Sequence, residues 1–479
     1  MRIVVAAMLA AVSSAAFAQA PSIVSQPAKL DSKWQAKARA IYETSVEIPT
    51  VAGRNEVPRL AGFLAGELKA AGFAADDIKI MPYEGVPGDK TAALIVRWRA
   101  DKPTARPILL MAHMDVVEAK REDWKQDPFE FSEKDGYFYG RGSLDNKAGM
   151  AGLVASFLKL RSEGFKPKRD LILFFTGDEE TRGEGARLGA TQWRQLIDAE
   201  YALNSDGGGG SFLPSGKPLG FGLQTAEKTF QTFQFTVRNK GGHSSRPRPD
   251  NAIYELAAAL KKLEAHRFQP MLKDTTRAYF AFRARQEGGS ALGKAMRAWL
   301  ANEQDGAAAD AIEASELEAG LTRTRCVATM LNGGHADNAL PQMAQATVNC
   351  RIMPGVQPDA VQAELRGIVG TGVEVTKDPD YAGRPTPVSP LRADVTKAYQ
   401  DAVRAVIGPN IPVAPFMSAG ATDGSFFREA GMPVYGMDGN WGITPDDERA
   451  HGLDERNPVR SFYDNLLFWE VVLKALAGR

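Results

Sequence analysis

The sequence has very little cysteine, with only Cys326 and Cys350 among its 479 residues. Two cysteines are too few for a framework of several disulfides and too few for a zinc site built on cysteine. Each lies in a segment that we expect to be a strand, with a Gly333-Gly334 turn region between them. A single bridge forms only if the two Cα atoms come within about 7 Å, and the sequence leaves this open.

An excess of charge of either sign is also missing, because 58 Lys and Arg residues balance 58 Asp and Glu residues. This balance favours neither nucleic acid nor an anionic membrane as a partner, so charge-dependent function must be local. After the first 20 residues no apolar run reaches the roughly 18 residues that a transmembrane helix needs. We therefore predict no nucleic-acid partner and no membrane partner.

The first 19 residues form a unit of their own. Arg2 gives a positive start, residues 3–12 are apolar, and Ala16-Phe17-Ala18 fits the small-residue rule for cleavage. This pattern is typical of a secretory signal peptide. We expect a mature chain that begins near Gln19 or Ala20 and is secreted, into a bacterial periplasm.

The length and the patterning predict two domains. In residues 20–226 and again in 385–479, apolar strands alternate with helices, which favours an α/β domain with a mostly parallel sheet. Between them, residues 227–384 read as strand, helix, strand, strand, helix, strand, with strict apolar–polar alternation at 233–238. We expect an α/β domain in two parts with a compact α+β domain inserted into it.

The most informative stretch is an apolar run, residues 171–175, that is separated from Asp178-Glu179-Glu180 by Thr176 and Gly177. Continuous apolar runs are typical of strands buried on both faces, and ligands bind at the carboxyl ends of such strands. A buried carboxylate must be paired or bound to a metal. Taken alone, the three acids are more typical of a solvated turn than of a site. We expect Asp178 to be a loop residue outside the mechanism.

Other strand ends carry residues of the same chemical kind. His113 and Asp115 follow an apolar strand and, at i and i+2, share a face, which suits a metal-bound imidazole oriented by a carboxylate. Asp145 precedes a helix, where it is either an N-cap or a carboxylate that bridges two cations. Asp206 follows another strand, and His451 lies in a loop near the last helix. Parallel strands would bring these residues to one sheet edge.

The three remaining histidines are less informative. His243 stands in a Gly-Gly-His turn of the inserted segment. His266 follows an amphipathic helix and is expected at the surface, and His335 is compatible with either a structural or a functional role.

Taken in their order along the chain, these residues resemble the motifs of the M20 family of metallopeptidases. That family includes dipeptidases, carboxypeptidases and N-acyl-amino-acid deacylases. The resemblance covers nearly the whole mature chain and is nearest to the carboxypeptidase-S-like branch. It rests on the following residues: His113, Asp115, Gly140-Arg141-Gly142, Asp145, Glu179-Glu180, Asp206, Gly241-Gly242-His243, Asn338 to Pro341, Arg351, Thr422-Asp423 and His451.

The resemblance implies two zinc ions per subunit, although Mn²⁺ or Co²⁺ also suits such ligands. By similarity, His113, Asp145 and Asp206 hold one ion. Glu180 and His451 hold the other together with Asp145, which bridges the pair.

Catalytic roles are implied in the same way. Asp115 would hydrogen-bond His113, and Glu179 would act as general base, carrying a proton from the attacking water to the leaving amine. His243 would stabilise the oxyanion, and in dimeric relatives this residue comes from the other subunit. The resemblance also implies that the two outer parts form the zinc-peptidase catalytic domain and that the inserted domain is a lid or dimerisation domain. The helical stretch 270–320 enlarges this lid, which is compatible with a homodimer or with a monomer.

For the substrate carboxylate, Arg351 is the best candidate because its planar fork suits bidentate recognition, although a lid-surface ion pair would explain it too. Asn338 and Gly420 are expected to help, and Arg384 is a weaker candidate. The sequence thus predicts an exported dinuclear zinc hydrolase that cleaves an amide beside a free carboxylate, in dipeptides, short peptides or N-acyl amino acids. The alternative is a non-catalytic peptide-binding or amino-acid-binding protein that keeps the fold.

Overall fold

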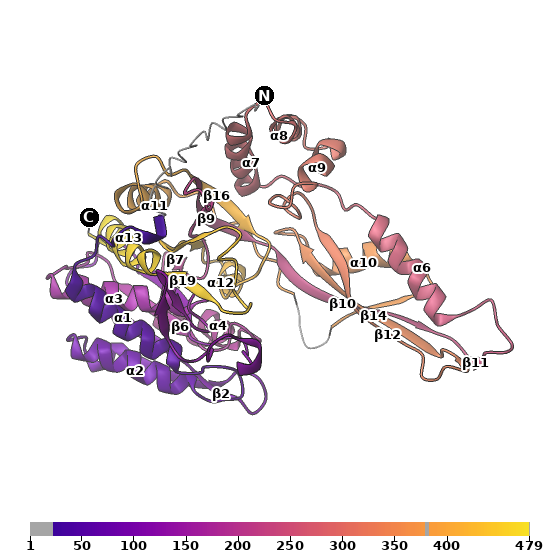
Figure 1. The fold of residues 1–479 in the computed structure, drawn as a ribbon, viewed down its shortest axis with the longest axis horizontal. Helices are drawn as coiled ribbons and strands as arrows, with labels where there is room; N and C mark the ends of the chain where they lie inside the picture. Colours follow the sequence, from indigo (N-terminus) through magenta and orange to yellow (C-terminus); the bar gives the residue numbers. More distant parts are fainter. Residues whose placement is uncertain (1–22, 379–382, 479) are drawn as a thin grey trace, which may run out of the picture.

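The structure, a computed structural model, describes residues 23–378 and 383–478 (Figure 1). The predicted signal peptide, residues 1–19, lies outside the described residues, and export stays a prediction. Among the helices of the described part, none is both long enough and apolar enough to span a membrane.

A ten-stranded sheet forms the larger part of the molecule, in the order β1-β2-β6-β3-β7-β17-β9-β8-β18, with β16 beside β9. Its central strands β6, β3, β7 and β17 run parallel, while β1 and β2 at one edge are antiparallel. The strands are β1 Ile78–Glu84, β2 Lys90–Trp98, β3 Ile108–His113, β6 Leu171–Thr176, β7 Tyr201–Asn204, β8 Gly210–Phe212, β9 Pro218–Glu227, β16 Val413–Ser418, β17 Val434–Gly436 and β18 Trp441–Ile443.

Neighbouring residues of a strand point to opposite faces of the sheet, and in the central strands β3 and β6 both sets are buried. Helices therefore cover both faces. Leu110 and Leu173 pack with helices on one face, whereas Met111 and Phe174 pack with helices on the other. The first face carries α1 Ser32–Glu47, α2 Val57–Ala70, α3 Lys147–Ser162, α11 Ala393–Val406 and α13 Val459–Ala477; the second carries α4 Glu184–Ala190, α5 Arg194–Ile197 and α12 Gly424–Glu429.

A separate antiparallel sheet, β12-β14-β10-β15, lies within the segment 227–384 and extends away from the large sheet (Figure 1). Along β14 every second residue is buried under α6 and α10, as expected for a sheet with one covered face. We call this segment the insert. Its elements are β10 Thr229–Arg238, β11 Gly242–His243, α6 Ala252–Ala265, β12 Arg325–Gly333, β13 Ala339–Leu340, β14 Met343–Ile352, α10 Pro358–Val369 and β15 Glu374–Lys377.

The stretch 270–320 is helical, as predicted, and packs on a small core of its own. Its helices are α7 Asp274–Glu287, α8 Ala291–Ala301 and α9 Gly306–Glu313, which enclose Phe280, Met296 and Trp299. Helix α7 contacts strand β16, so this cluster sits at the junction of the insert and the large sheet. Together the two sheets confirm the predicted class, an α/β domain with an inserted α+β unit.

The remaining elements are short. A three-stranded sheet, β19-β5-β4, forms beside the large one. The bounds are β4 Ser132–Lys134, β5 Tyr137–Tyr139 and β19 Arg456–Pro458, and the 3₁₀ turns are Ile23–Ser25, Ala75–Asp77 and Arg121–Asp123.

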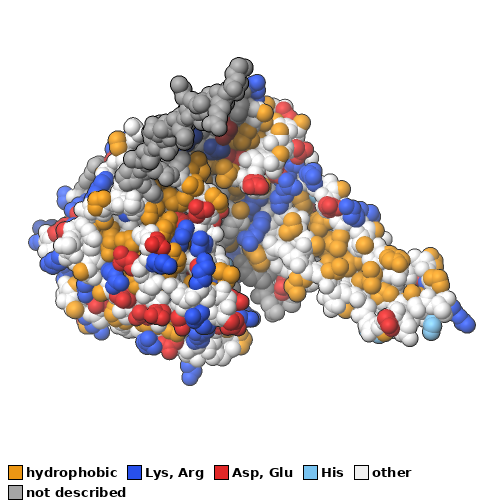
Figure 2. Space-filling view, in the orientation of Figure 1, with side chains coloured by type: hydrophobic (Ala, Val, Ile, Leu, Met, Phe, Trp, Pro, Cys, Tyr) orange, Lys and Arg blue, Asp and Glu red, His pale blue; other side chains and the backbone are white. Residues whose placement is uncertain are grey.

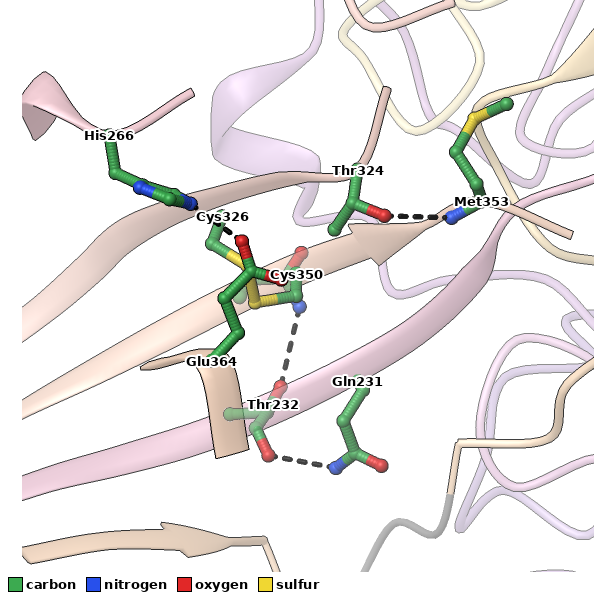
Figure 3. The surroundings of a disulfide bond; sticks show 9 residues. Gln231, Thr232, His266, Thr324, Cys326, Cys350, Met353 and Glu364 are labelled. Carbon is green, nitrogen blue, oxygen red and sulfur yellow. Dashed lines mark hydrogen bonds and ion pairs between the residues drawn. A yellow bond between two sulfur atoms is a disulfide. The ribbon is translucent and has the colours of Figure 1, made fainter. Parts of the chain in front are cut away.

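The two cysteines form a disulfide in the insert (Figure 3). Cys326 on β12 lies directly opposite Cys350 on β14, with the two Cα atoms 4.0 Å apart. His266, placed at the surface by the sequence analysis, is partly buried and pairs with Glu364 at 2.8 Å near the bridge. The bridge therefore ties an edge strand of the insert to its neighbour.

Candidate metal centre

Hydrogen bonds to the side chain of Asp178 hold the acidic turn that follows β6. Asp178 is only 2% exposed, and its carboxylate accepts hydrogen bonds from the Tyr83 hydroxyl at 2.6 Å and from the amides of Glu184 and Gly185 at 2.6 and 3.0 Å. Asp178 is thus a loop residue, as expected, but a buried one that fixes the turn. This role had no signal in the sequence, because its partners are 95 residues upstream and 6 to 7 residues downstream.

Asp115 connects this turn to the neighbouring parallel strand. Its carboxylate accepts hydrogen bonds from the amides of Glu179 and Glu180 at 3.2 and 3.0 Å. On the other side, Nδ1 of His113 lies 3.0 Å from the Asp115 carbonyl oxygen and 3.5 Å from its carboxylate. The His113 ring is thereby oriented with Nε2 facing the centre of the site.

Asp145 stands at that centre, between two histidines from opposite ends of the chain. Its Oδ1 lies 3.0 Å from Nε2 of His113, and its Oδ2 lies 3.4 Å from Nε2 of His451. Nε2 of His451 is also 2.9 Å from Oε2 of Glu180, and Nε2 of His113 is 3.7 Å from Oδ1 of Asp206. The five predicted ligands therefore form one continuous cluster.

This donor set fits divalent cations. Imidazole nitrogens and carboxylate oxygens are the ligands that zinc accepts, and two ligands of a tetrahedral zinc ion lie about 3.3 Å apart. The separations in the cluster are close to that value. His113, Asp145 and Glu180 can offer ligand atoms within 4.8 Å of one another, and so can His113, Glu179 and Asp206.

The cluster contains more carboxylates than its two imidazoles can neutralise. Burial and then repulsion from Asp206 raise the pKa of Glu179 well above its usual value, and burial raises the pKa of Asp206 to about 6. Burial disfavours protonated His113, but hydrogen bonds to its acidic neighbours outweigh that effect and raise its pKa. Hydrogen bonds to Asp145 and Glu180 raise the pKa of His451 to about 10. Such a cluster stabilises added positive charge.

Glu455 was not identified from the sequence, yet it organises the loop of Asp145. It is completely buried and pairs with Arg141 at 2.6 Å. Its carboxylate also accepts hydrogen bonds from the backbone amides of three residues: Gly142, Leu144 and Asp145. Arg141 in turn donates to the carbonyl of Gly452 at 3.0 Å, so this pair locks the Asp145 loop to the His451 loop.

The carboxylate of Asp206 is positioned by its neighbours. Asn146 donates to Oδ1 of Asp206 at 3.4 Å and to the carbonyl of Ser205 at 3.2 Å. The amide side chain at position 146 thus keeps a polar contact with the cluster and adds no further negative charge.

Two predicted site residues lie elsewhere in the same chain. β11, which contains His243, pairs with β13 next to Asn338, and Figure 1 places β11 at the far end of the insert. Ser244 donates to the carbonyl of Asn338 at 3.0 Å, so these two candidates are neighbours at that tip. His335, between β12 and β13, is exposed. Within one chain, His243 and Asn338 do not meet the acidic cluster.

Arg351, in contrast, does reach the cluster. It lines a cavity of about 360 Å³ together with Asp145, Glu179 and His451. Its guanidinium lies over the ring of Phe230, 4.8 Å from the centroid, and donates to the carbonyl of Ala419 at 3.3 Å.

The other substrate-binding candidates border this cavity without facing it. Gly420 donates to Ser418 at 3.0 Å, beside the lining residues Ala421 and Thr422. Arg384 lines an adjoining cavity and is paired with Glu429 at 2.8 Å.

Comparison with known proteins gives consistent matches. Residues 109–475 match the model of peptidase family M20/M25/M40. The chain is 31% identical over 376 residues to the human N-fatty-acyl-amino acid synthase/hydrolase PM20D1, covering 76% of this chain and 73% of the relative. It is 27% identical over 392 residues to the probable carboxypeptidase S-like 2 of Dictyostelium discoideum, covering 80% and 74%.

Solved structures share the fold. An M20 family metallo-carboxypeptidase from Sulfolobus solfataricus superimposes with a TM-score of 0.67 at 17% identity, covering 91% of this chain and 98% of that one. Human carnosine dipeptidase 1 gives a TM-score of 0.64 at 16% identity, covering 93% and 97%.

Proposed function

The chain belongs to the peptidase family M20/M25/M40 and is a metallohydrolase of that family, and from this premise we propose that it cleaves the amide bond next to a free carboxylate with the help of two zinc ions. Mn²⁺ or Co²⁺ suits the same ligands. The observation that carries the proposal is the position of Asp145, whose two oxygens face two different histidines.

The ligands divide into two sets around that shared carboxylate. His113 and Asp206 would hold one cation with Oδ1 of Asp145, and Glu180 and His451 would hold the other with Oδ2. The backbone amides of Glu179 and Glu180 donate to the carboxylate of Asp115, and these hydrogen bonds fix the position of Glu180 in one ligand set relative to His113 in the other.

The chain's own residues supply positioning and proton transfer. When bound, a pair of divalent cations polarises the substrate carbonyl and lowers the pKa of water at the site. Glu179 lines the cavity beside both ligand sets and would accept a proton from the attacking water and then donate it to the leaving amine. Arg351, in the same cavity, would hold the substrate carboxylate and so fix the scissile amide over Asp145.

The substrate class follows from Arg351 and from the relatives. Two relatives are named for N-fatty-acyl amino acids and for carboxypeptidase S, and two structural neighbours are named dipeptidases. All of these substrates carry a carboxylate close to the amide. A non-catalytic binding protein would not need five ligands and a general base, and all six residues are present here.

We expect a free carboxylate to be required for efficient turnover. For the zinc-loaded protein, kcat/KM should be about 10- to 100-fold higher for an N-acyl amino acid or dipeptide than for its C-terminal amide, because only the carboxylate forms a charge-assisted pair with Arg351. Steady-state hydrolysis of matched pairs measures this, and Arg351→Ala should abolish the preference. Absence of hydrolysis of every member of the panel would refute the proposed function.

We also propose that the protein is a homodimer in which His243 serves the site of the other subunit. Strand β12 is an edge strand of the described insert and exposes the apolar residues Val327, Met330 and Leu331. Figure 2 shows hydrophobic side chains gathered on this part of the insert. An exposed edge of this kind is suited to pairing with a second copy.

A mixing experiment tests this arrangement. Neither His243→Ala nor Glu179→Gln should turn over alone. A refolded or co-expressed mixture should recover about one quarter of wild-type activity, because mixed dimers contain one complete site. Sizing by light scattering should give twice the chain mass. A monomer, or a mixture without recovery, would exclude the shared site.

A further inference from the structure

The metal centre is flanked by two cavities, and the proposed mechanism uses only one of them. Asp145 and Asp206 line both. The first cavity contains Arg351. The second, of about 480 Å³, lies on the other side of Asp206, between the glycine loop of residues 207–210 and the segment 438–450.

The second cavity continues into a third, of about 430 Å³, under helix α7. The second and third cavities share five lining residues: Gly208, Gly209, Ser211, Thr444 and Glu448. We call the combined hollow the α7 groove. It begins at the acids of the metal centre and ends where α7, β9 and β16 meet.

The passage between the two halves runs along backbone without side chains. Gly208 and Gly209 have φ of +85° and +84°, a region that favours glycine. A Cβ on Gly208 would come within 2.8 Å of backbone atoms of Gly222 and Met437, and one on Gly210 within 2.2 Å of the Phe221 ring. The glycines at 207–210 thus present bare backbone to the groove, and on the opposite side they pack too closely against their neighbours for any side chain.

The distal half of the α7 groove is apolar. Its lining includes Phe282 on α7, Phe416 on β16, and Leu317 and Leu321 after α9. Leu317 is 59% exposed, and Phe282, Leu321 and Phe416 are only partly buried. Arg283 on the same helix is neutralised by Glu287 and Glu318 at 3.0 and 2.8 Å. Partly exposed apolar side chains that converge in a hollow are typical of a ligand site.

The charges of the two sides of the metal centre differ. Arg351 gives the first cavity a cation, whereas no lysine or arginine is among the described residues that line the entrance of the α7 groove. The acid Asp447 at this entrance is already paired with Arg456 at 2.7 Å. A substrate carboxylate therefore finds a cationic partner at Arg351 and none at the entrance of the groove. Any part of the substrate that enters the groove must be uncharged and, at the far end, apolar.

From these observations, and resting on the proposed function, we infer that the α7 groove binds the acyl chain of an N-acyl amino acid whose chain is long and aliphatic. The carboxylate would lie at Arg351, the amide over Asp145, and the methylene chain along Gly208 and Gly209 to Phe282 and Leu317. The bound water of the groove would be replaced by methylenes, which is favourable on apolar walls. A dipeptide is too short to use the distal half.

The chain-length dependence of hydrolysis tests the inference. We expect kcat/KM of the zinc-loaded, full-length protein to rise at least about tenfold from the N-acetyl to the N-dodecanoyl derivative of the same amino acid, mainly through KM. Fully buried methylenes would give about fourfold each, and the groove covers them only in part. Equal values for the two substrates, or a preference for dipeptides, would overturn the inference.

Variants of the groove make the test specific. Leu317→Asp and Phe282→Asp should lower kcat/KM for the dodecanoyl substrate at least about tenfold and leave the acetyl substrate unchanged, because the aliphatic chain would have to displace the hydration of the new carboxylate. The matched control is Ile80→Asp, an aliphatic residue 40% exposed on β1 outside the groove, which should change neither. An equal loss for both substrates would indicate a structural effect and contradict the inference, and thermal unfolding verifies each fold.

A binding measurement separates this inference from the proposed function. Calorimetric titration of the wild-type protein with dodecan-1-ol, an uncharged aliphatic chain, should show binding that Leu317→Asp removes. If no amide is hydrolysed but dodecan-1-ol still binds in this way, the proposed function fails and the groove remains. If amides are hydrolysed but dodecan-1-ol does not bind, the groove fails and the proposed function remains.

Discussion

Replacing Glu179 by Gln is expected to lower kcat by about 10²- to 10⁴-fold and to leave the bound metal unchanged, because Gln has the size of Glu but cannot accept the proton of the attacking water. Glu179 lines the cavity of Arg351 and lies beside both ligand sets. Burial and the repulsion from Asp206 raise its pKa, so a proton accepted from water is held more firmly than on an exposed glutamate. This is the behaviour that a proton shuttle needs.

The measurement is steady-state kinetics combined with metal analysis of the same preparation. The control is Glu184→Gln, five residues away, because Glu184 forms an ion pair with Arg187 at the surface of α4 and should change kcat little. The geometry also allows a second role, since Glu179 can offer a ligand atom together with His113 and Asp206. Loss of metal in Glu179→Gln would establish that role and contradict the assignment as general base.

The convergence of the metal-centre residues was predictable because it depends on strand order and direction. β3, β6 and β7 are adjacent and parallel, with His113 level with Thr176 and Met111 level with Asn204. Acids and histidines that follow such strands must meet at one edge. A local pattern, an apolar run that ends in polar residues, therefore carries information about a site assembled from distant parts of the chain.

The residues that support the centre were not predictable in this way. Glu455 and Asp145 are 310 positions apart, and their contact depends on the shapes of two loops. Neither loop has a period that would indicate which side chain is buried. Asp178 was recognised as a loop residue, but its burial depends on Tyr83 from another strand. Buried hydrogen-bonded carboxylates of this kind become visible only when the packing is known.

His243 shows a third limit. The sequence grouped it with the site on the strength of a family resemblance, whereas the chain places it at the tip of the insert, next to β13. Arg351, on β14 of the four-stranded sheet of the insert, does reach the centre, because it lies at the end of the strand nearest the large sheet. His243 and Arg351 thus lie at opposite ends of the insert, and the proposed dimer is the arrangement that would reconcile their positions.

Asp145→Ala should remove both metal ions, whereas His451→Ala should remove one. The reason is that Asp145 faces both histidines, through Oδ1 at 3.0 Å and Oδ2 at 3.4 Å, whereas His451 faces only Glu180 and Asp145. Two cations held by the neighbouring ligand sets would also repel each other strongly without the shared carboxylate of Asp145. We therefore expect Asp145→Ala to have no detectable hydrolysis.

Metal-to-protein ratios after dialysis distinguish the two variants. They should fall from two to near zero in Asp145→Ala and to about one in His451→Ala, because a site keeps its affinity only while its charged ligands remain. Asp454→Ala serves as the control, since this acid lies three residues after His451 and pairs with Lys125 at 3.3 Å, away from the centre. Retention of one ion by Asp145→Ala would show two independent sites. The carboxylate at position 145 would then belong to one site alone, and the two-metal geometry argued from its two oxygens would be wrong.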